Sequence, residues 1–133
     1  MNVLICSRDS AERLIQNNFP DSTAVICFHD PDKAPPDYNG IAEDVICIPL
    51  DSFQTDLPQA DIIADFIRRA ESQNHDIICQ CEKGQSRSAG CAAAIMEYYC
   101  SNGRDVFNDD RYRPDDMIYY AVLNALDRTG SQG

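Results

Sequence analysis

Tryptophan is absent from this chain, and histidine occurs only at His29 and His75. The sequence also has no Cys-x2-Cys pair, so it lacks the ligand spacing of a structural zinc site. No apolar run approaches the ~20 residues that a helix needs to cross a bilayer. The first residues have neither a basic region nor a small-residue cleavage pattern, so they predict a strand rather than a signal peptide. We therefore expect neither a metal site nor a membrane-spanning segment.

Positive charge is also scarce. The chain has 11 Lys and Arg against 22 Asp and Glu, which gives a net charge of −11. This charge repels nucleic acid and anionic membrane surfaces, so neither is expected as a partner. With 133 residues, of which 44% are hydrophobic, the chain is predicted to fold as one globular domain over residues 1–133.

Cysteine, in contrast, is frequent. The seven cysteines are Cys6, Cys27, Cys47, Cys79, Cys81, Cys91 and Cys100. Their number is odd and most lie inside apolar runs, which does not fit the disulfide framework of a small secreted domain. We expect most of them to be reduced thiols in the core of a cytoplasmic protein.

Short apolar, β-prone runs alternate along the chain with longer segments of helical spacing. The predicted strands span residues 3–6, 23–28, 45–50 and 77–80, and the predicted helices span 10–18, 59–71, 88–100 and a last segment opened by Pro114. This alternation predicts an α/β fold with a small, mostly parallel sheet flanked by helices. Ligands bind at the carboxyl ends of the strands in such sheets, so the loops after the third and fourth strands should lie at one edge.

The ends and faces of the helices follow from capping residues and apolar spacing. Ser10 or Asp9 is the expected N-cap of the first helix, and Asn102-Gly103 is the expected end of the third. The expected core positions are Ile62, Ile63, Phe66 and Ile67 in the second helix, and Met117, Ile118, Ala121, Val122, Ala125 and Leu126 in the last, which has Asp115 and Asp116 in its first turn.

The most informative segment is the octapeptide Cys81-Glu82-Lys83-Gly84-Gln85-Ser86-Arg87-Ser88. It lies between a predicted strand and a predicted helix, so its backbone N–H groups and the helix N-terminus are aimed at whatever occupies the loop. An anion fits there, and a thiol in the same field is expected to ionise readily. A Cys-x5-Arg spacing alone is weak, but the intervening Gly and the two flanking Ser residues make it specific.

These residues suit a phosphate monoester. The amides of residues 82–87 (Glu82, Lys83, Gly84, Gln85, Ser86 and Arg87) are the expected binding groups, and Gly84 lets the backbone bend. The Arg87 guanidinium matches two phosphate oxygens. Cys81 is the expected nucleophile, forming a thiophosphate, and the Ser88 hydroxyl is expected to stabilise its thiolate. Lys83 is either a second charge at the rim or a solvated residue, and Gln85 is a weak candidate for orienting water.

The leaving group needs a proton donor. Asp51 follows the third predicted strand directly and is the favoured general acid, while Asp56 is the second candidate. The alternative for Asp51 is a turn residue in a solvated acidic loop, and position alone does not separate these interpretations.

The octapeptide resembles the Cys-x5-Arg-Ser/Thr signature of the cysteine-dependent protein tyrosine phosphatases, and the chain looks most like their compact dual-specificity branch. The resemblance covers roughly residues 45–126 and includes a helix with Asp65-Phe66-Ile67. The thirty-residue separation of Asp51 from Cys81 is similar to the acid-to-nucleophile spacing of that branch, which favours Asp51. The resemblance implies a four-stranded parallel sheet, no metal and no organic cofactor. The acidic charge of the chain favours a phosphorylated protein or peptide over a polyanion as substrate.

The chain departs from this family in two ways. Gln80 stands where the family usually has a His that orders the loop, and the Trp-Pro-Asp acid loop of the larger tyrosine-specific enzymes is absent. The short chain predicts a shallow pocket that accepts phosphotyrosine and also phosphoserine or phosphothreonine.

Three other interpretations remain open. The first is a non-catalytic phosphate-binding module, which the Gln80 departure favours. The second is a rhodanese-like or arsenate-reductase-like enzyme, which the upstream Asp51 and the central position of Cys81 disfavour. The third concerns Cys79, which is expected to be a core thiol but has a second interpretation as a reversible disulfide partner that protects Cys81, a role that Cys91 or Cys6 could also take. The oligomeric state is open.

Overall fold

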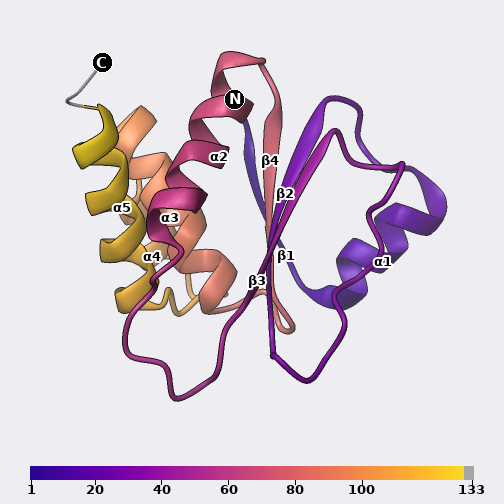
Figure 1. Cartoon of the computed structure of the whole chain (residues 1–133), viewed down its shortest axis with the longest axis horizontal. Helices are drawn as coiled ribbons and strands as arrows, with labels where there is room; N and C mark the ends of the chain where they lie inside the picture. The colour runs from indigo at the N-terminus through magenta and orange to yellow at the C-terminus, as the bar shows by residue number, and fades with distance from the viewer. Residues whose placement is uncertain (131–133) are drawn as a thin grey trace.

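The computed structural model describes residues 1–130 and has an α/β architecture (Figure 1). In chain order the elements are β1 (Val3–Cys6), α1 (Arg8–Asn17), β2 (Thr23–His29), β3 (Asp44–Pro49), α2 (Ala60–Ser72), β4 (Asp76–Gln80), α3 (Arg87–Cys100), α4 (Arg104–Phe107) and α5 (Asp116–Gly130). The short helix α4 was not predicted, because a single turn of four residues carries no periodic apolar signal.

The four strands form one sheet in the order β1-β4-β2-β3, and every neighbouring pair is parallel. The prediction of a mostly parallel sheet flanked by helices is therefore confirmed, with all four strands parallel. The inner strands β2 and β4 are apolar between their polar end residues and almost completely buried, as expected for strands covered on both faces. Because all strands run the same way, the loops after β2, β3 and β4 meet at one edge of the sheet (Figure 1).

Helices cover the two faces of the sheet unequally. α1 lies alone on one face, and α2, α3, α4 and α5 lie on the other (Figure 1). The main core is on the side of the four helices, where Phe28 of β2 packs among Ile63, Ile67, Ile95 and Leu126. This core anchors α3, and with it the helix N-terminus that follows the octapeptide loop.

The ends of α1 and α5 differ from the sequence expectation. The N-cap of α1 is Ser7, whose hydroxyl accepts a hydrogen bond from the Ser10 N–H at 3.1 Å, so neither Ser10 nor Asp9 is the cap. In α5, Asp115 lies before the first helical residue, and its carboxylate accepts from the Ile118 N–H at 2.9 Å. Both caps serve an N–H three residues ahead, a bond that apolar periodicity does not reveal.

The third helix is also shifted relative to the prediction. α3 begins at Arg87 rather than after it, so Arg87 and Ser88 both lie in its first turn. It ends at Cys100, and the left-handed residue that stops it is Ser101, with φ 58°, rather than Asn102 or Gly103. Gly103 instead passes close to α3, since a Cβ there would lie 2.5 Å from the Ala93 carbonyl oxygen.

One expected core residue lies at the surface. Ile62 of α2 is 60% exposed, whereas Ile63 is fully buried. The apolar spacing did not separate the two, because adjacent residues lie about 100° apart on a helix and one of them falls at the margin of a broad apolar face. The other three predicted core positions of α2 are buried.

Gly84, in the loop between β4 and α3, is held against the β1–α1 turn. Its φ is +65°, and a Cβ at this position would lie 2.6 Å from the backbone nitrogen of Ser7. Both the left-handed backbone and the contact distance therefore require glycine.

Most of the cysteines are core thiols, as expected. Five of the seven are buried, Cys47 and Cys100 are exposed, and no disulfide joins any of them. Along residues 1–130, every helix is too short or too polar to span a bilayer.

The adjacent isoleucines of α2 provide a matched test of the core. We expect Ile63→Ala to lower the free energy of unfolding by ~2–5 kcal/mol, because it leaves a cavity under the sheet. Ile62→Ala should cost less than ~0.5 kcal/mol, because its side chain is mostly in solvent. Urea denaturation measures both, and similar losses at the two positions would contradict this assignment of the buried face.

Gly84→Ala tests the close approach to the β1–α1 turn, with Gly40→Ala as its control. Gly40 has φ +75°, but a Cβ there would meet nothing within 4 Å. Gly40→Ala should therefore cost only the left-handed strain of ~1–2 kcal/mol. Gly84→Ala should cost about 1–3 kcal/mol more, because the added methyl group displaces backbone. Equal losses in urea denaturation would refute the steric argument.

Candidate functional site

A cavity of about 800 Å³ opens where the loops after β2, β3 and β4 meet. Its lining residues are Asp30, Pro31, Asp32, Lys33, Asp51, Ser52, Cys81, Glu82, Lys83, Gln85, Ser86 and Arg87. The structure thus brings Asp51 and the octapeptide loop together at one edge of the sheet, as their positions after parallel strands predicted. The cavity is bounded by three loops, and the residues of the first, which follows β2, were not predicted to belong to it.

Three carbonyl groups of the octapeptide loop are bonded to segments outside the cavity. The hydrogen bonds run from the Arg8 N–H to the Glu82 carbonyl (3.1 Å), from the Arg113 N–H to the Gln85 carbonyl (2.8 Å) and from the Asp115 N–H to the Ser86 carbonyl (3.0 Å). A fourth bond runs from the Gln80 side-chain Nε2 to the Cys81 carbonyl at 3.1 Å. Among the described residues, none of these four donor residues lines the cavity.

The N–H groups of the loop face the opposite way. All its peptide bonds are trans, so the N–H that follows each outward carbonyl points away from that carbonyl's partner. This turns the N–H groups of residues 82, 83, 86 and 87 toward the cavity. Within residues 1–130, no N–H from residue 82 to residue 88 donates to a protein atom. Together with the N-terminus of α3, these unpaired donors form a site of positive potential for an anion.

Cys81 lies at the base of this loop. Its side chain is 5% exposed, and its Sγ is 3.0 Å from the Oγ of Ser88, which is itself fully buried in the first turn of α3. The hydroxyl proton of Ser88 is therefore available to stabilise a thiolate. Ser88 is not among the described residues that line the cavity.

Arg87 lines the cavity from the first turn of α3, and its guanidinium is held by a carboxylate. Its Nη1 donates to Asp30 Oδ1 at 3.2 Å, with side chains that are 19% and 36% exposed. Asp30 comes directly after β2, as Asp51 comes after β3, so the rule that singled out Asp51 would also have identified Asp30. The Nη2 and Nε groups remain to form a two-pronged contact with an oxyanion.

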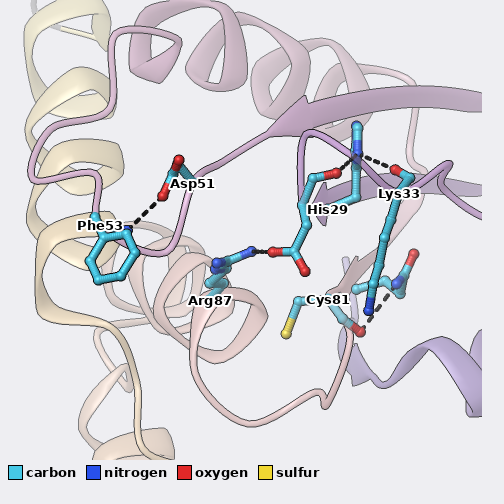
Figure 2. A network of polar contacts seen from close by, with 8 residues as sticks. His29, Lys33, Asp51, Phe53, Cys81 and Arg87 are labelled. Atoms are coloured by element: carbon cyan, nitrogen blue, oxygen red, sulfur yellow. Dashed lines mark hydrogen bonds and ion pairs between the residues drawn. The ribbon is translucent and has the colours of Figure 1, made fainter.

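His29 stabilises the turn that follows β2 and contains Asp30. The His29 Nδ1 lies 2.9 Å from the Asp30 carbonyl and 2.9 Å from the Lys33 carbonyl. Both partners are acceptors, so Nδ1 must carry the proton. Figure 2 shows this turn and the Lys33 side chain leading from it on the side of Cys81. Lys33 lines the cavity and, like Asp30, was not predicted.

Asp51 is exposed in the loop after β3, and its carboxylate is bonded locally. Oδ1 accepts a hydrogen bond from the Phe53 N–H at 2.9 Å, and Figure 2 shows the carboxylate turned toward that amide. Asp56, the second candidate, is exposed and is not among the described cavity-lining residues. The geometry therefore favours Asp51 over Asp56 for chemistry in this cavity.

Of the six predicted binding residues, five line the cavity and one does not. Glu82, Lys83, Gln85, Ser86 and Arg87 line the cavity. Gly84 does not, because it is buried against the β1–α1 turn and serves the shape of the loop. Lys83 lines the cavity and is also exposed, so its two interpretations, a second charge at the rim and a solvated residue, both stay open.

Side-chain charge alone does not make the cavity positive. Three cationic residues (Lys33, Lys83 and Arg87) line it together with four carboxylates (Asp30, Asp32, Asp51 and Glu82). Affinity for an anion must therefore come from the oriented N–H groups and from Arg87 at the base of the loop. Within residues 1–130, no cluster of His, Cys, Asp or Glu is arranged to hold a metal ion.

Cys79 lies in β4, two residues before Cys81. Its hydrogen bond with Cys91 and its complete burial raise the pKa of the Cys79 thiol well above the usual range. A thiol in this environment is unreactive, which supports the core interpretation of Cys79 over a disulfide with Cys81.

No model of a known protein family matches the chain, and no curated protein sequence matches it. Solved structures do match. Human DUSP28 superposes with a TM-score of 0.63 at 13% identity, over 98% of this chain and 95% of its own. Tk-PTP in its active form gives a TM-score of 0.66 at 15% identity, over 96% of this chain and 92% of its own.

A third similar structure is PTPMT1 in complex with PI(5)P, with a TM-score of 0.64 at 10% identity, over 98% of this chain and 94% of its own. These identities are low, so the likeness concerns the arrangement of the chain. The protein therefore has the fold of the cysteine-dependent protein tyrosine phosphatases, in the compact form of the dual-specificity branch.

Proposed function

We propose that this protein is a cysteine-dependent phosphomonoester hydrolase acting on phosphorylated proteins or peptides. The observation that supports it most is the loop after β4. It turns a row of N–H groups toward a cavity that has the Cys81 sulfur at its base, 3.0 Å from the Ser88 hydroxyl. A dianionic phosphate ester satisfies these donors, and its phosphorus then lies in front of the sulfur.

In the first step the Cys81 thiolate attacks phosphorus in line with the ester oxygen. The sulfur–phosphorus bond forms as the phosphorus–oxygen bond to the leaving group breaks. The loop N–H groups and the Arg87 guanidinium stabilise the charge on the three equatorial oxygens.

The leaving oxygen takes its proton from Asp51. Oδ1 of this carboxyl accepts a hydrogen bond from the Phe53 N–H, so Oδ2 is the oxygen that exchanges the proton. A rotation of the side chain brings it over the cavity that it already lines. Catalytic hydrogen bonds of this kind commonly form only with substrate present.

In the second step Asp51, now a carboxylate, takes a proton from water. The water oxygen attacks phosphorus, the sulfur–phosphorus bond breaks, and inorganic phosphate leaves. The electron pair returns to Cys81 as a thiolate, which the Ser88 hydroxyl stabilises. No cofactor enters either step.

The charges around the cavity bear on the substrate. PTPMT1 was solved in complex with PI(5)P. Here four carboxylates line the cavity and the whole chain carries a net charge of −11. Both features disfavour a polyanion and favour a single phosphate on a protein or peptide.

A phosphate-binding module without turnover is the second candidate. Its support is the Asp51 carboxylate, which is bonded to the Phe53 amide in this geometry. Such a module would bind a phosphopeptide through the same loop and would release no phosphate.

Three substitutions test the assigned roles with para-nitrophenyl phosphate as substrate. Cys81→Ser should abolish hydrolysis, because the hydroxyl is a much weaker nucleophile. Asp51→Asn should lower kcat by about 10²–10⁴-fold, because the leaving group loses its proton donor. Asp56→Asn is the matched control and should retain near wild-type kcat.

The same assay separates the alternatives. A large loss in Asp56→Asn with none in Asp51→Asn would reassign the acid. Phosphopeptide binding by the wild type without hydrolysis between pH 5 and 8 would instead support the binding module.

The breadth of the substrate class is tested with matched peptides that differ only in phosphotyrosine or phosphothreonine. The short chain predicts turnover of both, because it leaves little room for additional loops that would deepen the pocket around the reacting phosphorus. Phosphate release by each peptide gives kcat/KM, and a strong preference for tyrosine alone would contradict dual specificity.

A further inference from the structure

Gln80 is buried beneath the nucleophile. Its side chain is 2% exposed, and its Nε2 donates to the carbonyl of Cys81 at 3.1 Å. The second bond of this side chain goes to a residue far away in sequence. The hydroxyl of Tyr38 lies 2.7 Å from Gln80 Oε1.

The direction of both bonds follows from the chemistry of the groups. A backbone carbonyl only accepts, so the amide nitrogen of Gln80 must face Cys81. The amide oxygen then faces Tyr38, whose hydroxyl must donate. Burial raises the pKa of the Tyr38 hydroxyl well above its usual range, so the donor keeps its proton across the working pH range.

This chain of bonds determines the orientation of the Cys81–Glu82 peptide. With its carbonyl held by Gln80, the N–H of Glu82 points toward the anion site. A flipped peptide would place a carbonyl oxygen there instead and would repel both a thiolate and a phosphate. Tyr38 therefore controls a backbone donor that it does not touch.

Tyr38 is itself held in the long segment between β2 and β3, which the sequence identified only as a loop. Its side chain is 3% exposed, and its ring packs edge-on against Phe19 with centroids 6.1 Å apart. The same segment carries Asp30, the partner of Arg87. One loop thus supports both ends of the octapeptide.

We propose that Tyr38 is a positioning residue that acts through Gln80 to hold the Cys81–Glu82 peptide with its N–H directed at the substrate phosphate. This role rests on the function proposed above. The Tyr38–Gln80 pair thereby orders the backbone at the nucleophile through two buried hydrogen bonds.

The test removes the hydroxyl and keeps the ring. In Tyr38→Phe, alkylation of Cys81 by iodoacetamide, followed by peptide mass spectrometry, should require a higher pH than in wild type. Affinity for inorganic phosphate, measured by calorimetry, should fall about three- to tenfold, the range expected for one buried hydrogen bond. Tyr120→Phe is the control, because this tyrosine is 59% exposed on α5 and should leave both readouts unchanged.

A double-mutant cycle shows whether Tyr38 acts through Gln80. Gln80→Met should reproduce both changes, and adding Tyr38→Phe to it should cause no further change in either readout. Additive effects would overturn the relay. A wild-type alkylation profile together with wild-type phosphate affinity in folded Tyr38→Phe would overturn the role of Tyr38 altogether.

Urea denaturation of each variant confirms that it is folded. If Tyr38→Phe does not fold, Gln80→Met alone tests the proposal. A wild-type alkylation profile in Gln80→Met would show that the bond from Gln80 to the Cys81 carbonyl does not order the nucleophile, and the proposed role of Tyr38 would fail with it. Alkylation needs no turnover, so these outcomes are separate from the proposed function, which fails if Cys81→Ser still hydrolyses the ester.

Discussion

The site depends on one constraint, which is that four carbonyl groups of the octapeptide loop, those of Cys81, Glu82, Gln85 and Ser86, are bonded on the side away from the cavity. Their donors come from α1, from the segment before α5 and from the Gln80 side chain. Apart from Gln80, which is adjacent to Cys81, these donors are distant in sequence and are brought to the loop only by the fold. Because each outward carbonyl forces the next N–H inward, the packing of the helices around the loop creates its affinity for an anion.

This arrangement explains how a strongly acidic chain can hold a phosphate group. The carboxylates lining the cavity outnumber its cationic side chains, and Arg87 is already paired with Asp30. Fixed backbone dipoles do not depend on net charge and act at short range, whereas the surface carboxylates are solvated and screened. The acidic surroundings then select among phosphate esters, favouring those without further negative charge.

The segment between β2 and β3 has no regular secondary structure, yet it contacts the site at several points. It supplies Asp30 to the guanidinium, Lys33 to the cavity lining and Tyr38 to the residue behind the nucleophile. These contacts hold the segment in one conformation. The hydrogen bonds from His29 Nδ1 to the carbonyls of Asp30 and Lys33 stabilise the same conformation. Functional residues often lie on loops that a rigid scaffold carries. Here the loop also orders the backbone at Cys81, through the bond between Tyr38 and Gln80.

The sequence by itself determined the alternation of strands and helices, the parallel sheet, and the Cys81–Ser88 loop between β4 and α3, because these depend on local periodicity and on residues adjacent in the chain. It also placed Asp51 near the loop, since parallel strands end at one edge. It did not separate Ile62 from Ile63 or find the cap Ser7, because apolar spacing marks neither the margin of a helix face nor a capping bond. The position of Asp30 directly after β2 could have marked this residue, but its pairing with Arg87 and the bond between Tyr38 and Gln80 join residues 57 and 42 positions apart. Only the tertiary structure decides such contacts, because side-chain geometry there leaves no periodic trace in the chain.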